Sequence, residues 1–319
     1  MRLALSIPVH EKSEVIIDQI ININTHLDNP LIVLHFSKSF NWDSRYISKE
    51  NFYNVIKSKP FVYVNPQNLE TGFLNIFLTH ISNFKYLSTQ ISFDYFCLHS
   101  SNDLFVKTGI EEIIKNHNAG FSWFNQTEKN DWYFPHAQKD KSLLKIMNTL
   151  KIDQIIGSQM EGSYYTKEIF GKIVNIIEQN YVSNKFNYQR EEVYFPTIAQ
   201  AFTNINVNHG KNYIFIPWNY DLIITIKDVK SVIKSDTFFG LKRINRQINN
   251  YLRIYIRNSI GNYHKELDSI FGIKIKSYNL IDLSISDLIQ IIRKYLLLYI
   301  KKLYNSLNSK FFTKFWFSK

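Results

Sequence analysis

The chain has 319 residues, of which 45% are hydrophobic, so it is long enough for one large α/β domain or a domain with an appendage. Its one cysteine, Cys97, excludes an internal disulfide framework and suits a reducing compartment. The short apolar run at the N-terminus is interrupted by His10, Glu11 and Lys12, which predicts a first strand rather than a signal peptide. No stretch approaches the roughly 20 apolar residues of a membrane span, so we expect a chain that does not cross a membrane.

The formal charge of +11 is concentrated in the C-terminal part of the chain. Residues 229–319 hold 17 Lys/Arg and 5 Asp/Glu, whereas residues 1–228 hold 21 and 22. A localised basic block with aromatic residues favours an anionic partner, which can be membrane lipid, nucleic acid or a diphosphate. The alternative is a solvated helical face.

Short apolar runs and helical patterns alternate along the chain. Runs typical of strands or extended segments occur at residues 3–9, 31–36, 61–64, 93–98, 120–124, 155–165 and 213–217. Helical periodicity occurs after Ser13, which can cap a helix, and at residues 71–90, 110–116, 142–150, 167–179 and 191–201. Strands that alternate with helices predict a mostly parallel sheet covered on both faces.

From about residue 235 the sequence becomes helical and basic, which divides the chain into a main segment, 1–245, and a C-terminal segment, 246–319. A basic amphipathic helix is predicted near the end of the chain, and its apolar face consists of Leu288, Ile292, Tyr295, Tyr299 and Leu303. Aromatic residues between lysines at 310–319 are typical of an interfacial membrane anchor. The alternative is a helix that docks on the main domain.

Several enzyme classes are excluded by motifs that the sequence lacks. It has no G-x-G-x-x-G, no G-x-x-x-x-G-K-[ST] and no G-x-S-x-G sequence. The nine histidines lack metal-ligand spacing, and one cysteine cannot build a zinc site. The chain also has no Asp-x-Asp pair, with which many nucleotide-sugar transferases hold a divalent metal on the diphosphate. In a transferase of this sequence, Lys and Arg must neutralise the leaving group instead.

Four segments, in order along the chain, resemble motifs of the core-2/I-branching N-acetylglucosaminyltransferases and their peptide O-xylosyltransferase relatives. They are LSIPVHEK (5–12), FDYFCLHSSNDLFVKT (93–108), GSQ to YTKE (157–168) and EEVYFPT (191–197). A fifth segment, DV to FFGLKR (228–243), is similar to the aromatic-x-x-Lys stretch that gives a basic contact to the diphosphate in that family. The resemblance covers about residues 3–245, and it is the shared order of the motifs that makes it specific.

The resemblance implies an α/β, GT-A-like (Rossmann-like) domain with a mostly parallel sheet flanked by helices, followed by a basic helical C-terminal extension. It also implies an inverting, metal-independent glycosyltransferase without a cofactor. Such an enzyme moves a sugar from a nucleotide donor onto a hydroxyl of a glycan acceptor. UDP-GlcNAc is the first expectation for the donor, and UDP-xylose is another.

The sequence departs from the family pattern in three places. Ser37 stands where the family usually has an Asp for nucleotide recognition, so the identity of the base stays open. The segment 157–166 is about two residues longer than the usual pattern. A second arginine that assists the diphosphate in the family has no clear counterpart here.

Motif positions assign roles to the candidate site residues. Glu192 is the candidate base that removes the proton of the acceptor hydroxyl, and Glu191 is equally eligible. Lys242 and Arg243 stabilise the charge on the departing diphosphate, with a solvated basic face as the alternative. Asp103 hydrogen-bonds the donor sugar or the ribose, or else satisfies the amides of its own turn.

Further candidates follow from position at the carboxyl ends of predicted strands, where ligands bind in parallel sheets. Val9, His10 and Ser37 are candidates for nucleotide contacts, although His10 is equally well read as an ordinary strand-end histidine. Glu128 and Glu161 fall in regions that face the acceptor, with surface carboxylates as the alternative.

We therefore predict a transferase that builds a bacterial surface polysaccharide, such as a capsule or lipopolysaccharide, on a glycan or lipid-linked acceptor. The basic, aromatic C-terminal segment would bind an anionic membrane surface, so the predicted location is cytoplasmic and peripheral at the inner face of the plasma membrane. One alternative is a nucleic-acid-binding protein that uses the basic segment, but recognised RNA or DNA modules are missing and no nucleic acid partner is expected. Another is a catalytically inactive relative that only binds glycan.

Overall fold

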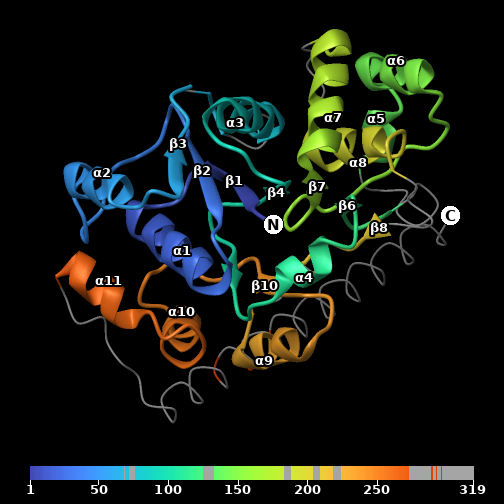
Figure 1. Ribbon diagram of the computed structural model, residues 1–319. Helices are drawn as coiled ribbons and strands as arrows, with labels where there is room; N and C mark the ends of the chain where they lie inside the picture. Colours follow the sequence, from blue (N-terminus) through green and yellow to red (C-terminus); the bar gives the residue numbers. More distant parts are fainter. Residues whose placement is uncertain are drawn as a thin grey trace, which may run out of the picture.

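The computed structural model describes residues 1–67, 69–71, 76–124, 133–182, 188–203, 209–217 and 224–272, and also Ile289, Ile292 and Leu296. Its centre is a seven-stranded sheet with the strand order β3-β2-β1-β4-β7-β6-β8, flanked by helices (Figure 1). In that order, the strands are Val62–Val64, Leu31–Phe36, Leu3–Val9, Tyr95–Leu98, Tyr164–Thr166, Ala119–Gly120 and His209–Gly210.

The sheet is mostly parallel, as the alternation of strands and helices predicts. Strands β3, β2, β1 and β4 run parallel, whereas β7 is antiparallel to both of its neighbours. All seven residues of β1 are buried, because this strand lies between β2 and β4 and is covered on both faces. The fold is therefore α/β and compatible with a Rossmann-like arrangement.

Alternate residues of β1 point to two hydrophobic cores on opposite faces of the sheet. Leu5 and Ile7 pack under one group of helices, and Ala4 packs under the other. The first group consists of α1 (Ser13–His26), α2 (Lys49–Lys57) and α11 (His264–Phe271). The second consists of α3 (Ile76–Gln90), α6 (Lys141–Leu150), α7 (Lys167–Asn180) and α8 (Tyr194–Ala199). Figure 1 shows the two groups on either side of the strands.

A second, smaller sheet carries part of the candidate site. Its three strands are β5 (Leu104–Phe105), β10 (Gly240–Leu241) and β9 (Ile214–Phe215), with β10 in the middle. Together with α9 (Ile226–Lys234) and α10 (Tyr251–Tyr255), it encloses a third hydrophobic core. Because Lys242 directly follows β10, this small sheet fixes where the predicted diphosphate contacts lie.

Two predicted runs are confirmed in part, and one predicted cap is wrong. The run at 213–217 forms β9 of the small sheet rather than a strand of the large one. The run at 155–165, predicted as a strand or an extended segment, is a strand only at its end, in β7, and its earlier part pairs through an isolated bridge between Gly157 and Phe124. The predicted cap Ser13 is wrong, because it is the first residue of α1 and the preceding Lys12 makes no side-chain capping bond.

Two further helical regions were incompletely predicted. The expected helix at 191–201 is a 3-10 turn, Arg190–Glu192, followed by the short helix α8. Helix α9 begins at a capping box in which Thr225 and Asp228 bond each other's backbone N–H groups, a signal that the sequence contains but that the apolar pattern does not reveal. Short helices at Ile110–Ile114 (α4) and Phe134–Ala137 (α5) complete the connections.

The first part of the C-terminal segment packs on the main domain through a buried ion cluster. Arg253 on α10 is fully buried, and its Nη1 donates to Oδ2 of Asp18 on α1 at 2.6 Å. The Nε atom of Arg253 donates to the carbonyl of Asn245 at 2.7 Å, and its Nη2 donates to the side chain of Asn102. The buried guanidinium of Arg257 lies 3.4 Å from the same Asp18. Residues 246–272 therefore share the body of the fold.

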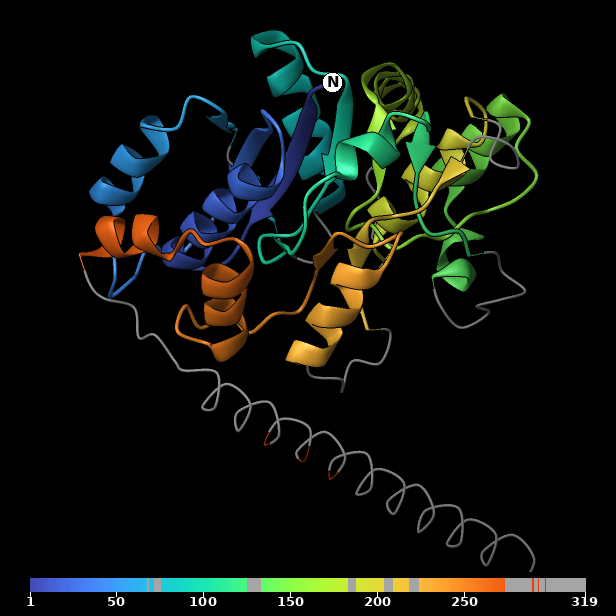
Figure 2. The ribbon, with the colours of Figure 1, turned by 60° about the horizontal axis from the view of Figure 1, so that its bottom comes forward.

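Figure 2 shows α9, α10 and α11 along one side of the molecule. Of the apolar face predicted near the end of the chain, the structure describes only Ile292, whose side chain is exposed. The other four residues of that face and the aromatic ending lie outside the described residues. Within the described ranges, no helix is both long and apolar enough to cross a bilayer.

Loss of Arg253 should destabilise the protein more than loss of an exposed cation from the same segment. We expect Arg253→Met to lower the free energy of unfolding by about 3–5 kcal/mol, because it leaves a buried carboxylate with one partner fewer. Lys265→Met, on the exposed side of α11, should change it by less than about 0.5 kcal/mol. Urea denaturation of both variants measures the difference. Equal free energies of unfolding would contradict a stabilising role of the buried Arg253.

Candidate functional site

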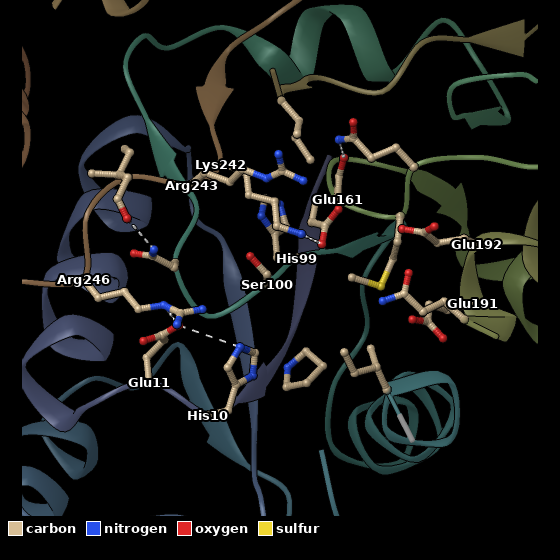
Figure 3. Close-up of a pocket in the computed structure, with 18 of the residues that line it drawn as sticks. His10, Glu11, His99, Ser100, Glu161, Glu191, Glu192, Lys242, Arg243 and Arg246 are labelled. Atoms are coloured by element: carbon tan, nitrogen blue, oxygen red, sulfur yellow. Dashed lines mark hydrogen bonds and ion pairs between the residues drawn. The ribbon is translucent and has the colours of Figure 1, made fainter. Parts of the chain in front are cut away.

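A cleft of about 750 Å³ lies at the carboxyl ends of β1 and β4, as expected for a ligand site in a parallel sheet. Segments that are far apart in the sequence line it, and Figure 3 shows their side chains directed toward a common space. The charged residues of its described lining are Glu11, Glu161, Glu191, Glu192, Lys242, Arg243 and Arg246. The other polar side chains of the lining include His10, His99, Ser100, Asn102, Tyr133, Gln159 and Gln189.

The end of β1 contributes His10 and Glu11. His10 is partly exposed, and burial together with the nearby charge of Arg246 lowers the pKa of its imidazole, so the ring is neutral at pH 7. Glu11 is 6% exposed, and burial raises the pKa of its carboxyl group despite the opposing charges of Arg246 and Arg253. The Nε atom of Arg246 lies 2.7 Å from Oε1 of Glu11, so the strand end holds an arginine over the cleft.

The loop after β4 is stiffened by Asp103. Its Oδ2 accepts the backbone N–H of Ser100 at 2.9 Å and lies 3.1 Å from Nδ1 of His99, and its Oδ1 accepts the Ser100 hydroxyl at 2.6 Å. The other ring nitrogen of His99 is 2.6 Å from the hydroxyl of Tyr213. Asp103 is 1% exposed and lies behind the cleft wall. The structure therefore gives Asp103 the role of holding its own turn and orienting His99, the alternative already open from the sequence.

The end of β10 contributes Lys242 and Arg243. Arg243 has φ of 69°, a left-handed conformation that costs a non-glycine residue about 1–2 kcal/mol, and its Nη1 donates to the carbonyl of Pro217 at 3.0 Å. The ammonium group of Lys242 donates to Oε1 of Glu161. Burial alone lowers the pKa of Lys242, but the carboxylates of Glu161 and Asp103 outweigh burial and raise it, so the ammonium stays charged.

The 3-10 turn before α8 places two carboxyl groups at the cleft. Glu191 is 3% exposed, and burial, with the charge of Glu161 adding to it, raises the pKa of its carboxyl group to about 8. Its Oε2 atom is buried without a hydrogen-bond partner among the described residues. Glu192 is more accessible, and its carbonyl accepts the N–H of Ser158 at 2.7 Å, which fixes the turn against the segment before β7.

The structure brings together four of the predicted charged residues: Glu161, Glu192, Lys242 and Arg243. His10 also lines the cleft, as predicted. Val9 and Ser37 lie next to each other, since the Ser37 N–H donates to the Val9 carbonyl at 3.3 Å, but both side chains are buried outside the described lining. The Ser37 hydroxyl donates to Glu70 at 2.9 Å. Glu128 lies outside the described residues.

Glu11 and Arg246 are site residues that the sequence did not single out. Glu11 follows His10 within the first motif, so the strand end itself was the available signal. Arg246 lies among other basic residues, and nothing in the local sequence distinguishes it from a solvated arginine. Its position depends on the burial of Arg253, which holds the adjacent carbonyl of Asn245.

Groups of three or more His, Cys, Asp or Glu side chains suited to a metal ion do not occur among the described residues. The cleft instead combines cations, which suit phosphate oxygens, with carboxyl groups, which suit hydroxyl protons. No protein-family model matches this chain, and no curated protein matches it either.

The pKa of Glu191 predicts a pH dependence of stability. Because the pKa in the folded protein, about 8, exceeds the ordinary value of 4.5, the contribution of Glu191 is fully present below pH 4.5 and is lost as pH rises through 8. Relative to Glu191→Gln, the wild type should lose several degrees of melting temperature, on the order of 5 °C, between pH 5 and pH 8.5.

Thermal melts of the two proteins across this range make the measurement. Glu178→Gln is the matched control, because Glu178 is an exposed carboxylate paired with Lys85 on the surface. Its curve should run parallel to that of the wild type. A Glu191→Gln curve that is also parallel to the wild type would contradict a protonated, buried Glu191.

Proposed function

We propose that the protein is an inverting glycosyltransferase that binds a nucleotide sugar without a metal ion and transfers the sugar to a hydroxyl group. One observation carries this proposal: a single cleft holds three cations, Lys242, Arg243 and Arg246, and two carboxyl groups of a neighbouring turn, Glu191 and Glu192. Figure 3 shows Arg246 and the two turn carboxyl groups at opposite ends of the drawn cleft, with Lys242 and Arg243 between them.

This arrangement matches the charges that develop in the reaction. Transfer breaks the bond between the anomeric carbon and the diphosphate oxygen, so negative charge grows on the diphosphate as it leaves. Fixed cations lower the energy of that charge, and they do so most effectively when they are held in place before the reaction. Lys242 is positioned by Glu161, Arg243 by the Pro217 carbonyl and Arg246 by Glu11.

Glu192 is the group that best fits the role of base. Inversion requires a carboxylate that takes the acceptor proton while the acceptor oxygen attacks from the side opposite the diphosphate. Glu191, with its pKa raised to about 8, is protonated at pH 7 and can donate a hydrogen bond but cannot accept the proton. The partly accessible Glu192 beside it can reach an acceptor in the cleft.

The sheet supports the same proposal at the level of the fold. The parallel strands β3-β2-β1-β4 followed by the antiparallel β7 are compatible with a GT-A-like domain, which the sequence resemblance implies. The cleft lies where the first, second, third and fourth resembling segments meet, since His10, Ser100, Glu161 and Glu192 all line it. UDP-GlcNAc remains the first donor to test, and a glycan or lipid-linked glycan at an anionic membrane surface remains the proposed acceptor.

A panel of nucleoside diphosphates and nucleotide sugars, tested by thermal shift with EDTA present, examines the binding step. We expect one base to stabilise the wild type, and Lys242→Met to weaken its binding about 10- to 100-fold, since a charge-assisted contact is lost. Lys230→Met, an exposed lysine on α9, is the control and should bind like the wild type. Absence of binding by every member of the panel would refute the transferase.

The catalytic step is tested by hydrolysis of the donor to free sugar, which needs no known acceptor. Glu192→Gln should lower kcat by about 10²- to 10⁴-fold with little change in KM, because the base is lost but the donor contacts remain. Glu191→Gln should retain activity within about tenfold. The opposite ranking of the two variants would assign the base to Glu191.

A further inference from the structure

The cleft contains an ion pair between Lys242, one of its three cations, and a buried carboxylate. Lys242 donates to Glu161, whose side chain is only 5% exposed, whereas the side chain of Lys242 is 26% exposed. Figure 3 shows this contact inside the cleft, between the end of β10 and the segment before β7. In the protein without a ligand, Glu161 thus takes the place of an anion on Lys242.

The backbone of Glu161 is held in place by its neighbours. Its carbonyl accepts the side-chain N–H groups of Gln159 and Asn212 at 3.2 and 3.5 Å. The next residue, Gly162, has φ of 78°, and a Cβ atom there would lie 2.5 Å from the backbone nitrogen of Ile214. Because the turn is fixed against β9, the backbone of Glu161 stays in place when Lys242 turns to a ligand.

Glu161 also belongs to a crowded group of charges. Its charge raises the pKa of Glu191, and the charge of Lys242 opposes this effect without overcoming it, so the lysine links the two carboxyl groups electrostatically. The charged and titratable groups that face this cluster are Lys242 and Arg243 after β10, Arg190, Glu191 and Glu192 in the 3-10 turn, His99 and Asp103 after β4, and His10 and Arg246 at the far end of the cleft.

We propose that an anionic ligand enters the cleft by taking Lys242 from Glu161, and that the buried carboxyl cluster then takes up a proton from solvent. The reason is that a buried carboxylate without a cation is costly. Once Lys242 pairs with a phosphate, protonation of Glu161, whose side chain is 5% exposed, costs less free energy than keeping it charged. At pH 7 Glu191 is already protonated, so the proton goes to Glu161; near pH 8, where Glu191 is partly ionised, it can also go to Glu191. Glu161 is therefore an internal competitor that weakens anion binding.

This inference deepens the proposed function and rests on it, because it takes Lys242 as a phosphate contact. It adds two consequences that a simple cationic site lacks. Binding is accompanied by proton uptake, so the affinity for the anion falls as pH rises. Removal of the Glu161 charge strengthens binding, even though it removes a partner that holds Lys242 in place.

Calorimetry of the full chain at pH 8 tests both consequences. The probe is the nucleoside diphosphate that stabilises the protein most among UDP, GDP, CDP, ADP and dTDP, because the terminal phosphate is almost fully ionised at this pH. Titrations in two buffers of different ionisation enthalpy give the number of protons exchanged. We expect the wild type to take up between about 0.5 and 1 proton per ligand.

Glu161→Gln should at least halve the proton uptake and bind the same nucleotide about tenfold more tightly. The matched control is Glu168→Gln, which removes the carboxylate of an exposed Lys–Glu pair on α7 and should leave affinity and proton uptake within about twofold of the wild type. If Glu161→Gln does not fold, the proton uptake of the wild type and its loss of affinity from pH 7 to pH 9 decide the question alone.

The outcomes separate this inference from the proposed function. Binding to the wild type without proton uptake, or with unchanged affinity in Glu161→Gln, overturns the displacement of Glu161 and leaves the transferase standing. Binding to Glu161→Gln but not to the wild type supports a strong internal competitor. Failure of all five nucleotides to bind either protein overturns both proposals.

Discussion

The guanidinium group of Arg253 joins three segments that are far apart in the sequence. It contacts Asp18 on α1, the Asn102 side chain in the loop after β4, and the Asn245 carbonyl in the loop after β10. Arg253 and Asp18 are fully buried, so each charge depends on the other and on the surrounding hydrogen bonds. The cleft wall is built from these same loops, and its shape follows from this cluster.

Pairing of charges gives the cleft its second constraint. Glu11 pairs with Arg246 and Glu161 pairs with Lys242, so that each of these two buried carboxyl groups has a cationic partner. A carboxyl group that cannot find a cation stays protonated instead, which is the state that burial imposes on Glu191 at neutral pH. The positive and negative charges of the cleft are thus close to balanced. A dianion that binds there must either displace a carboxylate from its cation or be accompanied by uptake of a proton.

The elements that the sequence predicted well are those in which local pattern and tertiary environment agree. The unbroken apolar runs at 3–9 and 31–36 are central strands because both faces of the sheet are covered there. The run at 213–217 looks the same locally, but it forms part of the small sheet, and only pairing with β10 decides this. The strand predicted at 120–124 is confirmed only at Gly120, the end of β6, and the two-residue strand β8 leaves too short a pattern to recognise.

The site residues divide in the same way, into those that the local sequence indicates and those that only tertiary contacts decide. Motif order placed Glu192, Lys242 and Arg243 together, because chemistry at a strand end or turn is visible in the local sequence. Motif order did not show that Asp103 turns inward to bond Ser100 and His99. The sequence of a loop is the same whether its aspartate contacts a ligand or its own backbone.

A crystal structure of the protein with a bound nucleotide sugar, grown without divalent metal, tests the central claim most directly. The account predicts a diphosphate oxygen within hydrogen-bond distance of Lys242 Nζ, the Lys242–Glu161 contact broken, and the anomeric carbon on the side of the cleft that faces Glu192. A nucleotide bound elsewhere, or bound in the cleft with Lys242 still paired to Glu161 and no cation on the diphosphate, would contradict it.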